Sequence, residues 1–169
     1  FDGLCGAAVA FKVAWAFAEA FCGSKNLPAV LRDALIATAP LAALGTVPDM
    51  VPLIDENRYL ARWGLSTMTT TTLPGLAALI KESKIDSSKV VDAMDAGFRL
   101  APRINACGRL DDPGQALELL LTDSPADAAA LARRLSMLND QRRKDQKVIE
   151  EAAVAKVIER GMDGDDQRI

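Results

Sequence analysis

The sequence predicts a mainly α-helical protein. Its strongly periodic segments repeat apolar side chains at helical spacing, and none of them makes a persuasive strand. Two segments begin with a capping residue followed by proline, Asp112-Pro113 and Ser124-Pro125, as helices commonly do. Alternating β and α units, which an open α/β sheet requires, are not visible. With 169 residues, half of them hydrophobic, the chain can form one globular domain with a core.

Two apolar helices are expected first, over residues 6–21 and 27–44. Gly23 should end the first helix, and Pro28 fits the first turn of the second. Pro40 should kink the second helix or split it in two. Because both segments are rich in alanine and carry few charges, we expect them to pack closely and to form the core of the N-terminal half.

Three shorter helices are expected in the middle of the chain. Asp55 should cap a helix over 56–63 that Gly64 ends, and Pro74 should start the next. Ser87 or Ser88 should cap the third. Their buried side chains are expected to include Tyr59, Leu60, Trp63, Leu76, Leu79, Ile80, Val90, Val91 and Met94.

A long helix is expected over residues 124–160, starting at Ser124-Pro125. An apolar stripe begins it, but residues 139–147 are polar throughout. This polar stretch could connect two lobes, or its basic side chains could contact a phosphate backbone. A solvated helix face is the simpler interpretation. The acidic, glycine-rich residues 161–169 are expected to form a flexible tail.

Between these helices lies an arginine-rich segment, GFRLAPRINACGRL, over residues 97–110. It carries Arg99, Arg103 and Arg109 and no acidic residue, although the net charge of the chain is -3. Its proline and its glycines predict an irregular loop. Guanidinium groups fixed in such a loop can bind phosphate or carboxylate ligands. Alternatively, the arginines pair with acidic neighbours and only hold the loop in place.

Composition excludes several kinds of site. The chain has no histidine, which removes Ser-His-Asp and Cys-His nucleophiles and His-based zinc sites. Glycine-rich nucleotide-binding loops are also missing from the sequence. Its three cysteines have no metal-binding spacing and are expected to be buried free thiols in a reducing compartment, so we expect a cytoplasmic protein. The longest uncharged run, 34–48, is short and contains proline and glycine, so no membrane span is expected.

Asp49 is the candidate carboxylate. It lies in the turn sequence GTVPDMVPL and is the only charge between Asp33 and Asp55. An aspartate beside proline is commonly a turn former, which is the simpler interpretation. A hard-metal ligand is the functional alternative.

Taken together, these motifs resemble the RecJ family of single-stranded-DNA exonucleases, within the Asp-His-His phosphoesterase superfamily. The resemblance covers nearly the whole chain, to about Glu159, and its pieces occur in the family's order. The matching segments are LCGAAVAFKVAWAF (4–17), ALGTVPDMVPLIDENRYLARWGL (43–65), GFRLAPRINACGRL (97–110), LELLLTD (117–123) and the Asn-x-x-Arg of 139–142.

The resemblance implies the helical part of an α/β phosphoesterase domain over 1–123, and a long interdomain connecting helix over 124–160. It implies that Asp49 is a catalytic metal ligand, for manganese or magnesium. Arg103, Asn105 and Arg109 would lie beside the substrate phosphates. The implied activity is 5′→3′ degradation of single-stranded DNA in repair and recombination. Three departures from the family pattern are Pro48, which could alter how Asp49 is presented, Asp55 and Cys107.

The family's other metal motifs, including its paired histidines, are missing from this sequence. We therefore expect the chain alone to be inactive and to hold no metal, and its partners to be single-stranded DNA and the remaining domains of its parent. The apolar faces of the first two helices could also drive self-association. One alternative is another superfamily member, an oligoribonuclease or pyrophosphatase relative. The other is a non-catalytic module that binds nucleic acid or protein through Arg99, Arg103 and Arg109.

Overall fold

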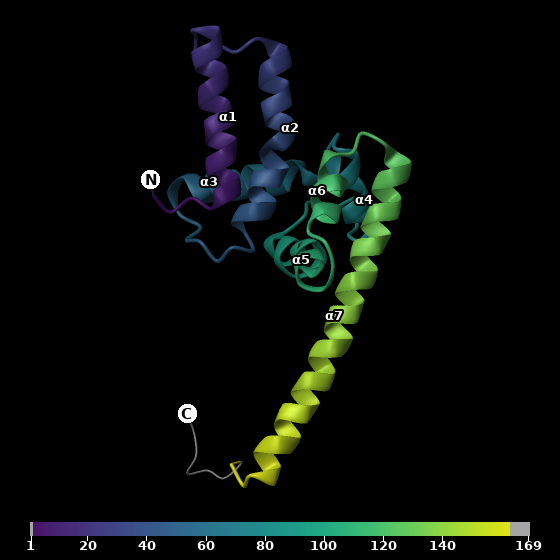
Figure 1. The fold of residues 1–169 in the computed structure, drawn as a ribbon. Coiled ribbons are helices and arrows are strands. Elements are labelled where there is room, and N and C mark those ends of the chain that lie inside the picture. Colours follow the sequence, from purple (N-terminus) through teal and green to yellow (C-terminus); the bar gives the residue numbers. More distant parts are fainter. Residues whose placement is uncertain (1, 163–169) are drawn as a thin grey trace.

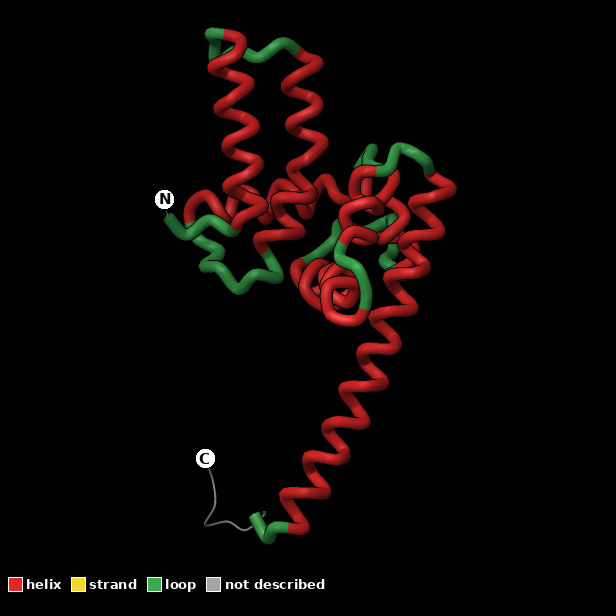
Figure 2. Tube along the Cα trace, viewed as in Figure 1, coloured by secondary structure: helices red, strands yellow, loops and turns green. Residues whose placement is uncertain are grey.

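The computed structural model describes residues 2–162, and every regular element in that range is a helix (Figures 1 and 2). The prediction of a mainly α-helical chain is confirmed. The elements are α1 (Gly6–Cys22), α2 (Ala29–Thr46), α3 (Asp55–Thr67), the 3₁₀ turn η1 (Met68–Thr70), α4 (Pro74–Glu82), the π-helix η2 (Asp95–Leu100), α5 (Ala101–Leu110), α6 (Gly114–Leu121) and α7 (Pro125–Glu159). The predicted flexible tail, 161–169, lies almost entirely outside the described residues.

Helices α1 and α2 form an antiparallel hairpin that projects from the rest of the molecule (Figure 1). Gly23 ends α1 in the left-handed conformation, as predicted, and α2 continues through Pro40 without splitting. The hairpin is only in part the expected core: just Ala8 and Ala18 of α1 are buried, whereas the C-terminal part of α2 is buried from Ala39 and contributes Ala43 and Leu44 to the main core. Its distal part exposes large apolar side chains, with Phe17 71% and Phe21 78% accessible.

Helix α3 crosses the C-terminal half of α2 at a close contact. A Cβ atom on Gly64 would lie 2.5 Å from the carbonyl oxygen of Ala39 and 2.5 Å from the Cβ of Ala43. The prediction that Gly64 ends this helix is therefore wrong, since α3 continues to Thr67. The glycine instead lets the backbones of α2 and α3 approach closely. The predicted cap is also wrong, since Asp55 is the first residue of α3 and makes no capping hydrogen bond. Tyr59, expected to be buried, is 81% exposed.

The main core lies where α4, α5 and α6 pack against the first half of α7. Its fully buried side chains include Leu76, Leu79, Leu119 and Leu135. Pro74 starts α4 as predicted, and the hydroxyl of Ser124 caps α7 by accepting a hydrogen bond from the Asp127 amide at 3.3 Å. The second half of α7 extends away from this body (Figure 2). The proposed division of the chain near residue 124 stays a prediction.

The arginine-rich segment is helical, which corrects the predicted loop. The π-helix η2 continues directly into α5, with Pro102 in the first turn of α5. Proline has no backbone N–H to donate, and it lies where the hydrogen-bond ladder changes from the π spacing of η2 to the α spacing of α5. The expected Ser87 or Ser88 cap is also wrong: the Asp92 carboxylate accepts from the Asp95 amide at 2.8 Å, and Val90 and Met94 are exposed.

Two further expectations concern cysteines and membranes. Cys5 and Cys107 are buried, Cys22 is half-buried, and all three are free thiols. Helix α2 is long and apolar enough, by length and composition alone, to cross a membrane. A helix in the core of a soluble protein can have the same length and composition. The C-terminal part of α2 packs against α3.

Candidate functional site

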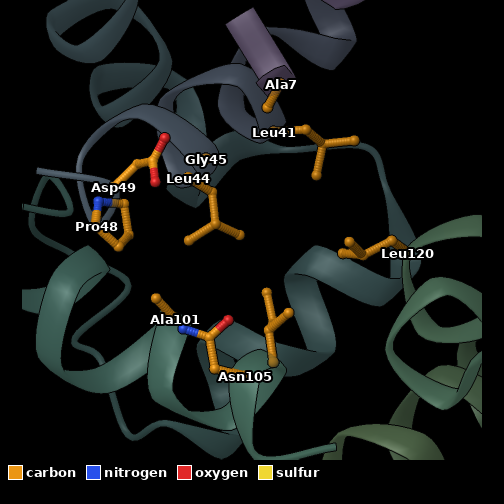
Figure 3. A pocket seen from close by; sticks show the side chains of 10 residues that line it. Ala7, Leu41, Leu44, Gly45, Pro48, Asp49, Ala101, Asn105 and Leu120 are labelled. Carbon is orange, nitrogen blue, oxygen red and sulfur yellow. The ribbon is translucent and has the colours of Figure 1, made fainter. Parts of the chain in front are cut away.

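A pocket of about 360 Å³ opens between the end of α2 and α5. Figure 3 shows Asp49 and Asn105 on facing sides of it, with Pro48 beside Asp49 and Ala101 beside Asn105. The rest of the lining is mainly apolar: Ala7, Leu41, Leu44, Gly45, Ile104 and Leu120. The fold therefore brings together two of the predicted site residues that are far apart in the sequence.

Asp49 lies in the irregular turn that follows α2. The helix ends at Thr46, and the prolines at 48 and 52 keep the following backbone from continuing it. Its carboxylate is exposed and makes no ion pair or side-chain hydrogen bond with any residue between 2 and 162. The aspartate is thus available at the pocket rather than engaged as a turn-forming acceptor.

The chain does not by itself complete a metal site. Within residues 2–162, no cluster of three or more Asp, Glu, Cys or His side chains could hold an ion. Asp49 and the Asn105 amide are the polar side chains at the pocket. Divalent metals such as Mg²⁺ and Mn²⁺ take several oxygen ligands, so this pair could supply only part of a ligand set.

Arg99 is engaged inside the fold. Its Nη1 forms an ion pair with the Asp95 carboxylate at 2.8 Å, and its Nη2 donates to the carbonyls of Ser83 at 2.7 Å and Lys84 at 2.5 Å. The simpler interpretation, an arginine that holds its segment in place, therefore describes Arg99.

Arg103 points towards α7 and not into the pocket. Its Nε donates to the hydroxyl of Ser136 at 2.9 Å, and its Nη1 donates to the carbonyl of Arg99 at 2.5 Å. Burial lowers the pKa of Arg103 below its ordinary value, although an arginine remains charged at neutral pH. Because α-helical residues two apart face nearly opposite sides, Arg103 and Asn105 diverge from α5.

Asn105 and Arg109 lie one turn apart on α5, and both are exposed. Arg109 makes no ion pair or side-chain hydrogen bond with residues 2–162. It is in the last turn of α5, where a cation is favourable beside the helix dipole. The four predicted site residues thus divide into Asp49 and Asn105 at the pocket, Arg109 one turn beyond it, and Arg103 at the α5–α7 contact.

The sequence did not reveal Ser136 as a contact of this segment. It lies beside the leucine stripe that begins α7 and is 8% exposed. The one feature of the sequence that could have indicated this contact is a single polar residue, Ser136, next to an apolar stripe. Asn139, one turn later, is 4% exposed and its Oδ1 has no hydrogen-bond partner in the described structure.

Comparison with known proteins gives consistent matches, although no family model matches the sequence. The "Single-stranded-DNA-specific exonuclease RecJ" of Bacillus subtilis is 37% identical over 96% of this chain, and that of Thermus thermophilus is 39% identical over 90%. The chain spans only 19% and 20% of these relatives. A crystal structure of exonuclease RecJ bound to manganese superposes on 90% of the chain with a TM-score of 0.71 and 36% identity, covering 35% of that structure. RecJ from T. thermophilus in complex with Mn²⁺ matches 72% of the chain, and 18% of its own, at a TM-score of 0.62 and 38% identity.

Proposed function

This chain belongs to the RecJ family, and from that premise we propose that it is one segment of a metal-dependent 5′→3′ single-stranded-DNA exonuclease. The parent would hydrolyse phosphodiester bonds during DNA repair and recombination. The relatives are single-stranded-DNA-specific exonucleases, and related structures hold Mn²⁺ or Mg²⁺. A cytoplasmic location is part of the proposal, and the three free cysteines support it.

The observation that carries the proposal is the shared pocket of Asp49 and Asn105. They come from the two segments that most resemble the family's metal-binding motif and its signature loop. An exposed carboxylate without a partner can serve as one metal ligand among several, with the others contributed from outside this chain. The isolated chain should therefore be inactive.

The phosphate-binding role falls on α5. Arg109 and Asn105 are exposed on one side of this helix and can donate hydrogen bonds to phosphate oxygens. Arg103 can contribute its Nη2 and the second N–H of its Nη1, since Nε and one Nη1–H already donate within the chain.

Nuclease assays test the metal-ligand role. The isolated chain, supplied with Mn²⁺, should leave a single-stranded oligonucleotide intact. In the intact parent, Asp49→Asn should remove the activity because the amide replaces a charged metal ligand. Asp33→Asn is the matched control, since Asp33 is exposed on α2 and pairs only with Arg32. Asp49-dependent degradation by the isolated chain, or an active Asp49→Asn parent, would contradict the proposal.

A binding module without chemistry is the second candidate, favoured by the absence of a complete ligand set among residues 2–162. In that case the isolated chain binds single-stranded DNA, and Arg109→Ala lowers the dependence of log Kd on log salt by about one contact. Arg62→Ala, an exposed arginine on α3, is the control. If the intact parent is an active nuclease and its activity requires Asp49, the non-catalytic binding module is excluded.

Self-association of the isolated chain is proposed through the α1–α2 hairpin. Val9, Val13, Phe17 and Phe21 recur every fourth residue along α1 and are 45–78% exposed. The rings of Phe17 and Phe21 stack with centroids 6.3 Å apart. A continuous exposed apolar stripe of this kind favours contact with another apolar surface.

A further inference from the structure

We propose that Ser136 of α7 is a positioning residue that keeps Arg103 available to a phosphate of single-stranded DNA. The inference rests on the phosphate-binding role proposed above for α5. Ser136 would act by fixing the orientation of the Arg103 guanidinium.

A chain of hydrogen bonds fixes the position of Arg103. Its Nε donates to the Ser136 hydroxyl, and its Nη1 donates to the carbonyl of Arg99. Arg99 is itself held by the Asp95 carboxylate and by the carbonyls of residues 83 and 84. Two of the five N–H donors of Arg103 are therefore engaged, and the second Nη1–H and the two Nη2–H groups are left for a ligand. Because the group is planar, fixing two nitrogens also fixes the direction of the third.

Two carboxylates compete for the same guanidinium. Asp140 and Glu82 both lie near enough to attract the charge of Arg103. Asp140 follows Ser136 by one turn of α7, so the two side chains lie on the same side of that helix. Neither carboxylate forms an ion pair with Arg103 in the described structure. The neutral Ser136 hydroxyl accepts from Nε, and together with the Arg99 carbonyl it holds the guanidinium in an orientation that forms no ion pair with either carboxylate.

A serine is suited to this task at this position. Ser136 is 8% exposed on the face of α7 that otherwise packs alanines and leucines. A buried hydroxyl needs a hydrogen-bond partner, and it finds one in Arg103. An alanine would leave Arg103 without its Nε acceptor and free to turn towards Asp140.

The test measures binding of the 169-residue chain to a fluorescent oligothymidylate, by anisotropy over a series of salt concentrations. Ser136→Ala and Arg103→Ala should each weaken binding about tenfold and lower the salt dependence by about one phosphate contact. Ser136→Thr, which keeps the hydroxyl, should bind as the wild type does. The decisive variant is Ser136→Ala combined with Asp140→Asn and Glu82→Gln, which removes both competing carboxylates and should restore binding.

The outcomes separate the inference from the function on which it rests. If Ser136→Ala lowers only the melting temperature, or if removing both carboxylates fails to restore binding, Ser136 is not a positioning residue. If Arg103→Ala weakens binding while Ser136→Ala does not, the inference fails and the phosphate-binding role survives. If the wild type does not bind, or Arg103→Ala leaves the salt dependence unchanged, the role of Arg103 itself is wrong. Circular dichroism checks that each variant folds.

Discussion

Replacing Gly75 with alanine should open the contact between α4 and α6. A Cβ atom at Gly75 would lie 1.7 Å from the carbonyl oxygen of Leu119, 2.7 Å from its carbonyl carbon and 3.3 Å from the Cα of Leu120. Carbon–oxygen contacts usually fall at about 3.3–3.6 Å, so the helices must separate by about 1.6 Å or more. The clashing atoms belong to the backbone, and no change of side-chain rotamer can relieve the overlap.

Separating α4 from α6 loosens a buried interface and lowers the free energy of unfolding. Leu76, Leu79 and Leu119 are all fully buried at the same interface. Overpacking of a well-packed core costs about 1–3 kcal/mol and occasionally more. The better helix propensity of alanine returns about 0.5–1 kcal/mol. Because the overlap at 1.7 Å is with backbone, the upper end of the overpacking range, about 3 kcal/mol, applies. Less about 1 kcal/mol for helix propensity, we expect a net loss of about 2 kcal/mol, which lowers the melting temperature of a chain this size by about 4–8 °C.

Thermal and urea unfolding followed by circular dichroism measure this effect. Gly97→Ala is the matched control, because a Cβ at Gly97 would meet nothing within 4 Å. It should leave stability unchanged or raise it by up to about 1 kcal/mol. A Gly75→Ala variant that melts at or above the wild-type temperature would show that the reasoning about α4 and α6 is wrong.

Three other predictions concern the surface of the molecule. Ser124→Ala removes the α7 cap and should cost about 1 kcal/mol in chemical unfolding. The hydrogen bond from Arg134 holds the pKa of Asp111 below its ordinary value. Its stabilisation is therefore present at neutral pH and lost as the pH falls through the acid range, so the melting temperatures of wild type and Asp111→Asn should converge in acid. Phe17→Glu should shift the isolated chain towards monomer in sedimentation, and an unchanged distribution would exclude the α1 stripe as the interface.

Local signals in the sequence correctly predicted the helix starts at Pro74 and Ser124, but not those expected at Asp55 and at Ser87 or Ser88. Ser124 and Pro74 act through their own backbone geometry and through neighbours a few residues away, so no knowledge of tertiary packing is needed. Gly64 shows where this approach fails. Glycine ends helices and also permits close helix contacts, and only the position of Ala39 on α2 distinguishes the two roles.

The exposure of the α1–α2 hairpin could not be predicted from hydrophobicity alone. Periodicity indicates which face of a helix is apolar but not whether anything covers it. The composition of α1 predicted burial, whereas Phe17 and Phe21 are exposed. Similarly, no periodic pattern could place Asp49 opposite Asn105. Only the resemblance to a family suggested that their two segments share a site.

The helicity of the arginine-rich segment changes what each residue in it can do. A loop would leave all three arginines free to converge on one ligand, but a helix separates its side chains by position. Arg99 and Arg103, four residues apart, both donate within the fold. Asn105 and Arg109, also four apart, are exposed, and Asn105 lines the pocket of Asp49. One face of the segment therefore anchors it to α7 and to residues 83 and 84, while the other exposes polar groups at the pocket. Because Arg103 lies on the anchoring face, any contact that it makes with phosphate would depend on the packing of α7, which links this helix to the candidate site.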